Sequence, residues 1–428
     1  MHYIKKIKKE WTDALRYAPQ VRRAFRRWFT SKGDRAANYS EKLDYYFKGA
    51  TSLLSPSEDT LSARINAQLD KITDISSWAK KHYGETSHVV SKGIIIKPFV
   101  SEQEKGVIYV SFEKHLIRLL NANDFSTLQD QFIIVFAPSW SPPHSPALFA
   151  MPRILNDGLF TTISNAVDHD YMALISTKLT SLHLYASSWV NSEKFQLRPF
   201  EDKDIDLLVI ANYGTFKRHI ALFKALSELS KDIRVTLIGQ EEPGRTLDDI
   251  KNEAELYGVG HMIEFAGPQP YEKITEYLSR SKTTAIFSKR EGSCVVVVES
   301  MAANVPVAVL KDAELGSKEF VNDQTGVLLE NTNMGKQLQR FIDNAGNYQP
   351  RQWLLDNGIT YQGSVKYLNN RLKHWHKQHN KPWTKDLFTL ERSPLATIAK
   401  PEEQKIMQKE QQRVYEEFGL WIGREKNQ

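Results

Sequence analysis

The sequence predicts an α/β protein with two domains built on parallel sheets. From about residue 88 to residue 350, short apolar segments alternate with helical or loop segments. Alternation of this kind is typical of strand–helix–strand units, which form parallel sheets with right-handed crossovers. With 428 residues, the chain has room for two or three domains and a large buried core. Residues 1–86 lack this alternation and are predicted to be mostly helical.

The first α/β domain is predicted at 87–203. Its candidate strands are the apolar segments 93–99, 107–111, 132–136, 159–163 and 182–186. Residues 137–147 contain four prolines and are predicted to form a loop.

The second α/β domain, at 204–350, has the more regular pattern. Its predicted strands are 207–210, 235–238, 262–265, 285–287, 305–310 and 327–329, and its predicted helices include 217–229, 247–257, 271–278 and 334–344. Thr246, followed three residues later by Asp249, has the pattern of a capping box at a helix start. The series indicates a doubly wound parallel sheet.

The composition is that of an ordinary globular protein, with 41% hydrophobic and 25% charged residues. No apolar segment approaches the roughly 20 residues that cross a bilayer. The first residues lack the apolar core and cleavage site of a secretory signal. The only cysteine, Cys294, cannot form an intrachain disulfide. We therefore expect the reducing cytosol as the compartment.

The basic character of the chain is concentrated at its amino terminus. Residues 1–35 hold five lysines and six arginines against three acidic residues, a net charge of +8, whereas the whole chain carries +6. Apolar residues recur there at helical spacing, namely Ile4, Ile7, Trp11 and Leu15, then Val21, Phe25, Trp28 and Phe29. Such helices favour either an anionic membrane surface or docking of the apolar stripe on the protein itself, with the charges in water. A nucleic-acid enzyme would spread basic residues around its site, so we expect no nucleic acid as partner.

Ligands of an open parallel sheet bind beyond the carboxyl ends of its strands. Four predicted strands of the second domain are followed there by glycines, cations or carboxylates. The candidates are Asn212, Lys217 and Arg218, then Gly239, then Glu291, Gly292, Ser293 and Cys294, then Gly316 and Ser317. Cations at a helix start are disfavoured unless something anionic binds, so Lys217 and Arg218 are candidates for a diphosphate.

Two glutamates, Glu291 and Glu299, lie eight positions apart in the segment that follows strand 285–287. Eight residues of helix rise about 12 Å, the length of a sugar joined through phosphate to a ribose. Carboxylates accept hydrogen bonds from pairs of sugar hydroxyls. Gly292 and Ser293 stand where backbone amides can approach a phosphate.

This arrangement resembles the Glu-x7-Glu motif of retaining glycosyltransferases of the two-domain GT-B type, in the family usually numbered four. The resemblance implies that Glu299 holds the ribose and Glu291 lies beside the transferred sugar. Gly316 and Ser317 resemble the phosphate loop of that family. In the family an arginine and a lysine follow the first strand of the second domain. Lys217 or Arg218 fits the lysine, and Asn212 stands where the arginine is expected.

The resemblance also implies a GT-B architecture, with two Rossmann-like doubly wound domains and an added helical N-terminal region. Residues 351–428 would then be a helical tail that returns to the first domain, with 402–418 as the crossing helix. Family members usually carry a glycine-rich loop after the first strand, whereas this chain has Lys97-Pro98-Phe99 after its first predicted strand.

For the acceptor side we single out Asn165, His169 and His144 in the first domain. Cys294 is expected to be a packed residue beside the donor, because no histidine lies near it in sequence to activate the thiol. The acidic pairs among Asp202, Asp204 and Asp206 precede a strand and are interpreted as a linker rather than a metal site.

Together these features predict a retaining, metal-independent glycosyltransferase for a hexose-type sugar, with a UDP- or GDP-linked donor and no cofactor. The acceptor would be a glycan, a lipid-linked glycan or a protein, as in polysaccharide biosynthesis, and the enzyme would be cytoplasmic, with a peripheral place at the inner membrane face also open. Three alternatives remain: an epimerase-type enzyme on nucleotide sugars, a non-catalytic sugar-binding GT-B protein, and a membrane-surface adaptor that acts through residues 1–35.

Overall fold

The computed structural model describes residues 2–392 and 395–424, which form two compact units. Unit 1 combines helix α1 (His2–Tyr17) with the segment Val190–Thr360, and unit 2 combines Pro19–Trp189 with the chain from Tyr361 onward. The chain therefore passes from one unit to the other three times, after Ala18, Trp189 and Thr360. These units divide the chain differently from the predicted domains, because the N-terminal helices belong to different units.

Unit 1 is built on a six-stranded sheet in which every pair of neighbouring strands is parallel. Its strand order is β12 (Gly326–Leu329), β11 (Val307–Leu310), β10 (Ser281–Ile286), β7 (Ile205–Ile210), β8 (Val235–Ile238) and β9 (Ile263–Gly267). The order reverses where β7 pairs with β10. This is the doubly wound sheet that the sequence predicts, and the reversal defines its topological switch point.

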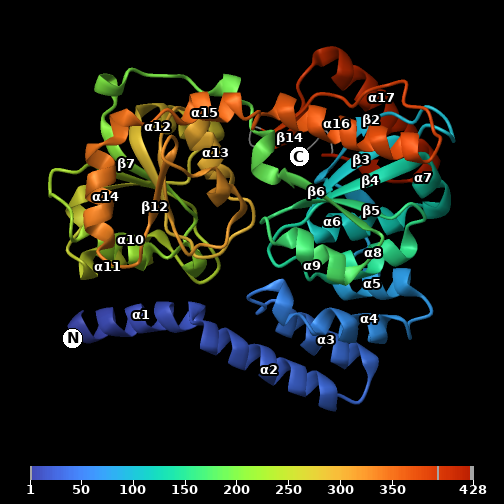
Figure 1. The fold of residues 1–428 in the computed structure, drawn as a ribbon, viewed down its shortest axis with the longest axis horizontal. Helices are drawn as coiled ribbons and strands as arrows, with labels where there is room; N and C mark the ends of the chain where they lie inside the picture. Colours follow the sequence, from blue (N-terminus) through green and yellow to red (C-terminus); the bar gives the residue numbers. More distant parts are fainter. Residues whose placement is uncertain (1, 393–394, 425–428) are drawn as a thin grey trace. The chain divides into compact units, whose positions relative to one another are not determined.

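Helices flank both faces of this sheet (Figure 1). They are α10 (His219–Leu226), α11 (Leu247–Leu256), α12 (Tyr271–Arg280), α13 (Val295–Ala302), α14 (Met334–Asp343) and α15 (Pro350–Asp356). The capping box predicted at Thr246 is present, since the Thr246 hydroxyl and the Asp249 carboxylate each accept from the backbone N–H of the other residue. The helix predicted at 217–229 starts later, because Arg218 has left-handed backbone (φ 55°) and Lys217 lies in a short 3-10 turn.

Unit 2 has a five-stranded sheet whose strands follow in chain order. They are β2 (Gly93–Lys97), β3 (Gly106–Ser111), β4 (Phe132–Ala137), β5 (Leu159–Ile163) and β6 (Leu179–Tyr185). Strands β3 to β6 are parallel, but β2 is antiparallel to β3. The end of β2 therefore lies at the opposite edge from the carboxyl ends of the other strands. This explains the missing glycine loop, because Lys97-Pro98-Phe99 is not at the ligand-binding edge.

The two faces of this second sheet are covered by different parts of the chain. One face packs against the helices between its own strands, α6 (Glu113–Arg118), α7 (Phe125–Gln131) and α8 (Pro146–Ile154), through residues such as Leu116, Leu128 and Leu148. The other face packs against Leu368 and Leu372 of α16 (Tyr361–Gln378), which crosses it in Figure 1. The hairpin of β13 (Leu390–Arg392) and β14 (Ala396–Ile398) joins this second layer.

The remaining helices complete unit 2. Helices α2 (Pro19–Arg35), α3 (Tyr39–Ala50), α4 (Leu61–Leu69) and α5 (Ile75–Tyr83) precede the sheet, and a core cluster joins Leu43 and Leu61 to Phe149 and to Tyr171 of α9 (Asp168–Ile175). At the other end of the chain, α17 (Pro401–Phe418) contributes Val414 and Phe418 to the core, and β15 (Trp421–Ile422) pairs with β1 (Val89–Val90).

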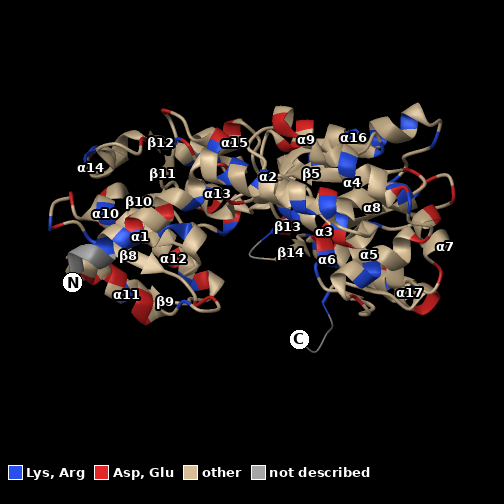
Figure 2. Cartoon of the chain, turned by 90° about the horizontal axis from the view of Figure 1, so that it is seen from below, with Lys and Arg blue, Asp and Glu red and all other residues tan. Residues whose placement is uncertain are grey.

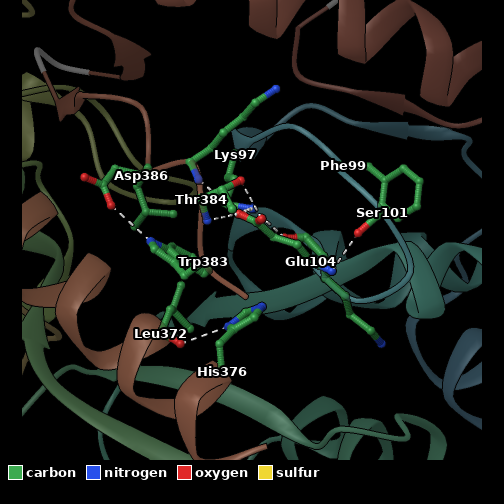
Figure 3. Close-up of polar contacts among 12 residues, drawn as sticks. Lys97, Phe99, Ser101, Glu104, Leu372, His376, Trp383, Thr384 and Asp386 are labelled. Carbon is green, nitrogen blue, oxygen red and sulfur yellow. Dashed lines mark hydrogen bonds and ion pairs between the residues drawn. The ribbon is translucent and has the colours of Figure 1, made fainter. Parts of the chain in front are cut away.

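A buried ion pair fixes the C-terminal segment to the sheet of unit 2 (Figure 3). Lys97 Nζ lies 3.0 Å from Glu104 Oε1, and both side chains are almost fully buried. The Glu104 carboxylate also accepts from the backbone N–H groups of Thr384 and Lys385 and from the Thr384 hydroxyl. Burial alone would raise the pKa of Glu104, but these donors and Lys97 lower it to about 2. The carboxylate therefore stays charged and links the loop between β2 and β3 to residues 384–385.

Charged residues of both signs are scattered over the elements of both units (Figure 2). Within the described residues, no helix is both long enough and apolar enough to cross a bilayer.

Candidate donor site

Lys217 and Glu291 meet at the topological switch point of unit 1. Lys217 follows β7 and Glu291 follows β10, the two strands between which the order reverses. Lys217 Nζ donates a hydrogen bond to Glu291 Oε1 over 2.8 Å, with side chains that are 15% and 9% exposed. In open α/β sheets, ligands bind in the crevice at this kind of point. Lys217 and Glu291, both predicted as site residues, therefore lie together at the position where this kind of sheet binds ligands.

A small cavity of about 10 Å³ lies beside this pair, lined by the ends of β7 and β10 together with Lys217, Glu291 and His219. Its volume is that of roughly one water-sized sphere. His219 is almost fully buried, and its ring nitrogens have no hydrogen-bond partner among the described residues. Burial, and then the charges of Arg245 and Lys217, lower the pKa of His219 to about 3, so its imidazole is neutral. Sequence reasoning missed His219, for which the only signal was its position after Lys217 and Arg218.

The loop that carries Glu291 is held by the loop after β11. The Glu291 N–H donates to the carbonyl of Glu314 (3.0 Å), and the N–H groups of Gly316 and Ser317 donate to Gly292 and Ser293 (3.1 and 3.2 Å). The Ser317 hydroxyl donates to the carbonyl of Cys294 over 2.9 Å. The structure thus brings the predicted phosphate-loop residues directly against the predicted sugar-side loop.

Cys294 is buried at the start of α13 in left-handed backbone (φ 52°). Burial, followed by the nearby Glu291 carboxylate, raises the pKa of the thiol well above its ordinary value. The thiol is therefore held in its neutral form, as a packed residue would be.

The two glutamates do not lie on one helix. Glu291 is in the loop, α13 begins at Val295, and Glu299 is in the second turn of that helix and is 8% exposed. The 12 Å helical rise expected between them therefore does not apply, because residues 291–294 precede the helix.

Arg218 is separated from this site by its own backbone conformation. Its guanidinium turns to α1, where Nε and Nη2 each lie 2.9 Å from Asp13 Oδ2, and it stacks 5.5 Å from the ring centre of Tyr17. The structure therefore leaves Lys217, and not Arg218, as the cation beside Glu291. Arg218 instead anchors the N-terminal helix.

Asn212 and Gly239 lie at the ends of β7 and β8. The Asn212 amide donates to Glu242 Oε1 over 2.6 Å and accepts from the Gly214 N–H over 3.3 Å. A Cβ at Gly239 would lie 2.2 Å from the carbonyl oxygen of Ala211, so only glycine lets the two strand ends approach so closely.

The three acceptor-side candidates have separate partners in unit 2. His144 Nε2 is fully buried, 2.8 Å from Asp59 Oδ2 and 3.0 Å from the Ser62 hydroxyl. His169 Nδ1 lies 2.5 Å from the Ser181 hydroxyl, and the Asn165 N–H donates to Asp168. Burial alone would raise the pKa of Asp59, but His144 and Ser62 lower it to about 2. The acceptor-side role of these three residues stays a prediction. The buried contacts of His144 with Asp59 and Ser62 hold parts of unit 2 together.

Two of the acidic residues interpreted as a linker, Asp204 directly before β7 and Asp206 within it, have cationic partners. Asp204 pairs with Arg280 over 2.6 Å, and Asp206 pairs with Lys282 over 2.8 Å. Both lie at the amino-terminal end of β7, away from the ligand edge, but the linker interpretation is wrong for Asp206, which is a buried residue of the strand.

Helix α1 docks on unit 1 through its charged face. Lys9 pairs with Glu253 (2.6 Å), and Glu10 accepts from the Tyr257 hydroxyl (3.0 Å) and pairs with Lys224 (3.1 Å). The apolar row faces away, with Ile7, Trp11 and Leu15 exposed by 37%, 65% and 49%. The expectation that docking would bury the apolar stripe and leave the charges in water is therefore wrong for α1. The surface that α1 contacts on α10 and α11 carries Lys224 and Glu253, so it binds the charged face of α1.

Comparison with known proteins finds a family match for part of this chain. Residues 190–352 match the profile of a family described as Glycosyl transferases group 1. A relative from Methanocaldococcus jannaschii, described as uncharacterized glycosyltransferase MJ1178, is 25% identical over 127 residues, which span 30% of this chain and 35% of the relative. The match thus covers about a third of that relative's length.

A solved structure of Anabaena Alr3699/HepE in complex with UDP and glucose aligns with 71% of this chain and 81% of its own, with a TM-score of 0.50 and 12% identity. The same protein in complex with UDP also gives a TM-score of 0.50, at 13% identity, over 71% of this chain and 82% of its own. At such identities the likeness concerns the fold. The chain therefore has the GT-B fold, and its residues 190–352 are similar to the glycosyl transferases group 1 family.

Proposed function

We propose that this protein is a metal-independent glycosyltransferase that moves a hexose-type sugar from a nucleotide sugar to an acceptor hydroxyl with retention of configuration. The observation that carries the proposal is the Lys217–Glu291 pair, at the switch point of the domain that matches the family. A largely buried cation and carboxylate at a ligand-binding edge offer one partner for a phosphate and one for sugar hydroxyls.

Donor binding would redistribute this pair. The diphosphate competes for the Lys217 ammonium, and the released Glu291 carboxylate accepts hydrogen bonds from the sugar. Backbone amides of the loop that holds Gly292 contribute further donors to the phosphates, and the N–H groups of Gly316 and Ser317 hold this loop in place. As the sugar–phosphate bond breaks, Lys217 stabilises the negative charge that develops on the leaving group. The acceptor hydroxyl then attacks the anomeric carbon from the same face and gives its proton to the departing diphosphate oxygen, while Glu299 holds the ribose.

The donor is proposed to be UDP-linked, with GDP as the second choice. Support for UDP and for a hexose comes from the HepE structure, which holds UDP and glucose. The acceptor is proposed to be a glycan, a lipid-linked glycan or a protein.

Transfer assays with single variants test the assignment. We expect Glu291→Gln and Lys217→Met each to lower kcat/KM for the donor by about 10²-fold or more, because the first weakens the hydrogen bonds to the sugar and the second removes charge stabilisation at the leaving group. Glu299→Ala should lower it through weaker donor binding. Glu272→Gln and Lys251→Met, exposed positions on α12 and α11, serve as matched controls. Normal turnover in the Glu291 or Lys217 variant, with the melting temperature unchanged, would refute the proposal.

The same assays separate the alternatives. An epimerase would convert the donor with no acceptor present, which chromatography of the donor alone detects. A non-catalytic binding protein would show donor binding by calorimetry and form no product with any acceptor.

We also propose that the protein works at an anionic membrane surface on the cytoplasmic side. Support comes from α1, which exposes both the apolar residues Ile7, Trp11 and Leu15 and the neighbouring cations Lys8 and Arg16. An apolar face bordered by cations is the chemistry that binds anionic lipid interfaces.

Sedimentation with vesicles of phosphatidylglycerol and phosphatidylcholine tests this surface. Trp11→Ser combined with Leu15→Ser should weaken binding at least tenfold and leave transfer to a soluble acceptor unchanged, because the docked polar face is intact. Leu328→Ser, another exposed apolar residue of unit 1, is the control. Equal vesicle binding by the double variant would contradict the role of α1, and a change in oligomeric state would instead assign the row to a second copy.

A further inference from the structure

Unit 2 contains a cavity of about 490 Å³ that the donor chemistry does not use. It opens beside the carboxyl end of β3, where Tyr109 and Ser111 line it, and is bounded by the β13–β14 hairpin and by α17. The volume lies within the range of about 300–1,000 Å³ that is typical of small-molecule sites. Its place at the carboxyl edge of the parallel strands is also where such sheets bind ligands.

Three cations from separate segments converge on this cavity. Lys92 comes from the turn before β2, Arg392 from the end of β13, and Arg424 from the chain after β15. Glu391 is the only acidic residue among those that line it, so the lining carries a net charge of +2. Burial, followed by the charges of Arg424 and Arg392, lowers the pKa of Lys92. Like charges gathered at a partly buried site repel one another, and an anion in the cavity would relieve this repulsion.

The other walls of the cavity are apolar. Ile94, Tyr109, Trp189, Met407 and Trp421 line it. The Trp421 indole donates to the carbonyl of Arg424 over 2.8 Å, and the Gln411 amide donates to the carbonyl of Ile422, so neighbouring side chains hold this part of the chain. Apolar walls with a cationic rim suit a ligand that combines an apolar chain with an anionic head.

We propose that this cavity binds an amphiphile with a phosphate head group and an apolar chain, and that this amphiphile is the acceptor or its lipid carrier. The binding itself stands on the cavity and its three cations, and only the acceptor role rests on the proposed function. A phosphate fits three cations better than a carboxylate, because it offers three terminal oxygens and a larger negative charge.

Calorimetry with three probes tests the chemistry on the full chain. Decyl phosphate, below its micellar concentration, carries both parts of the ligand, whereas decanol lacks the anion and inorganic phosphate lacks the apolar chain. We expect decyl phosphate to bind at least tenfold more tightly than either of the others. Decanol that binds as well would overturn the anionic part of the proposal, and inorganic phosphate that binds as well would overturn the apolar part.

Variants then locate the binding. Lys92→Met and Arg424→Gln should each weaken decyl phosphate at least tenfold and leave UDP affinity unchanged, because Lys217 and Glu291 belong to the other unit. Lys366→Met, an exposed lysine of α16 outside the cavity, is the matched control. Unaltered decyl phosphate affinity in both cavity variants would overturn the site. UDP binding tests the donor site and decyl phosphate binding tests the cavity, so either proposal can fail without the other.

Discussion

The two sheets of this molecule acquire their second helical layer in different ways. In unit 1 the strand order reverses between β7 and β10, so helices between its own strands flank both faces. In unit 2 the strands follow in chain order, and α16 and the β13–β14 hairpin supply the second layer from about 200 residues further along the chain. The first arrangement creates a switch point and the second does not.

The difference between the two sheets coincides with the limits of the family match. The profile match covers 190–352, which is the unit with the reversed strand order. Unit 2 departs from the expected pattern at β2 and depends on the C-terminal segment for its core. The candidate donor-site residues therefore lie in the unit that matches the profile, whereas the predicted acceptor-side residues lie in the other unit. Four predictions test the comparison, in order of expected effect.

Glu104→Ala should destabilise unit 2 more than any exposed substitution. It leaves the buried Lys97 ammonium without its carboxylate and frees residues 384–385 from the sheet. Loss of one partner of a buried pair costs about 3–5 kcal/mol. Urea unfolding followed by tryptophan fluorescence measures the loss, with the exposed Glu102→Ala as control. Equal effects of the two substitutions would show that the C-terminal segment does not depend on this pair.

Acid should weaken unit 2 within a defined range. The pKa values of Glu104 and Asp59 are lowered from ordinary values of 4.5 and 3.8 to about 2. Groups with depressed folded pKa values stabilise the fold above their unfolded pKa and lose that contribution as pH falls through the folded value. The free energy of unfolding should therefore be level with respect to these groups above pH 4.5 and fall toward pH 2. Unfolding of the Glu104→Gln variant should depend less on pH, and an identical profile would argue against Glu104.

Asp13→Ala should loosen α1 from unit 1. The substitution removes the carboxylate that holds Arg218, and hydrogen bonds to charged groups contribute about 1.5–3 kcal/mol. We expect faster amide hydrogen exchange in α1 and unchanged exchange in α3 of unit 2. Thr12→Ala, on the exposed side of α1, is the control. Unchanged exchange in α1 would mean that Lys9 and Glu10 suffice to hold it.

Thr246→Ala should have the smallest effect. It removes one half of the capping box of α11, which costs about 1 kcal/mol. Thermal unfolding of unit 1, monitored with UDP-dependent stabilisation, measures the change. Ser230→Ala, a loop position in the same unit, should change less, and a larger effect there would contradict the cap assignment.

Sequence reasoning located most elements but not their orientation. The apolar runs placed β7, β8 and β11 within about two residues, whereas β10 starts four residues before its predicted position, because its first residues are polar. An apolar run carries no direction, so the antiparallel pairing of β2 could not be predicted. A helical stripe likewise does not say which face docks, and α1 turned its charged face inward because α10 and α11 present charges.

The candidate site was predictable where two loops follow neighbouring parallel strands, which is why Lys217 and Glu291 meet. The site was less predictable where a single backbone angle decides the direction of a side chain. Left-handed backbone at Arg218 sends that side chain to Asp13, although it adjoins Lys217 in sequence. His219 was missed because it lines the cavity as a buried residue, and the sequence does not show whether a histidine is buried.

The chain crosses between the units three times, after Ala18, Trp189 and Thr360. A protease that cuts one or two of these junctions leaves the halves covalently joined, so only a triple cut yields separable fragments. Neither half is a continuous stretch of sequence, and a simple truncation cannot express either one alone. Ribosomal synthesis must also complete residues 361–398 before the sheet of unit 2 can cover its second face.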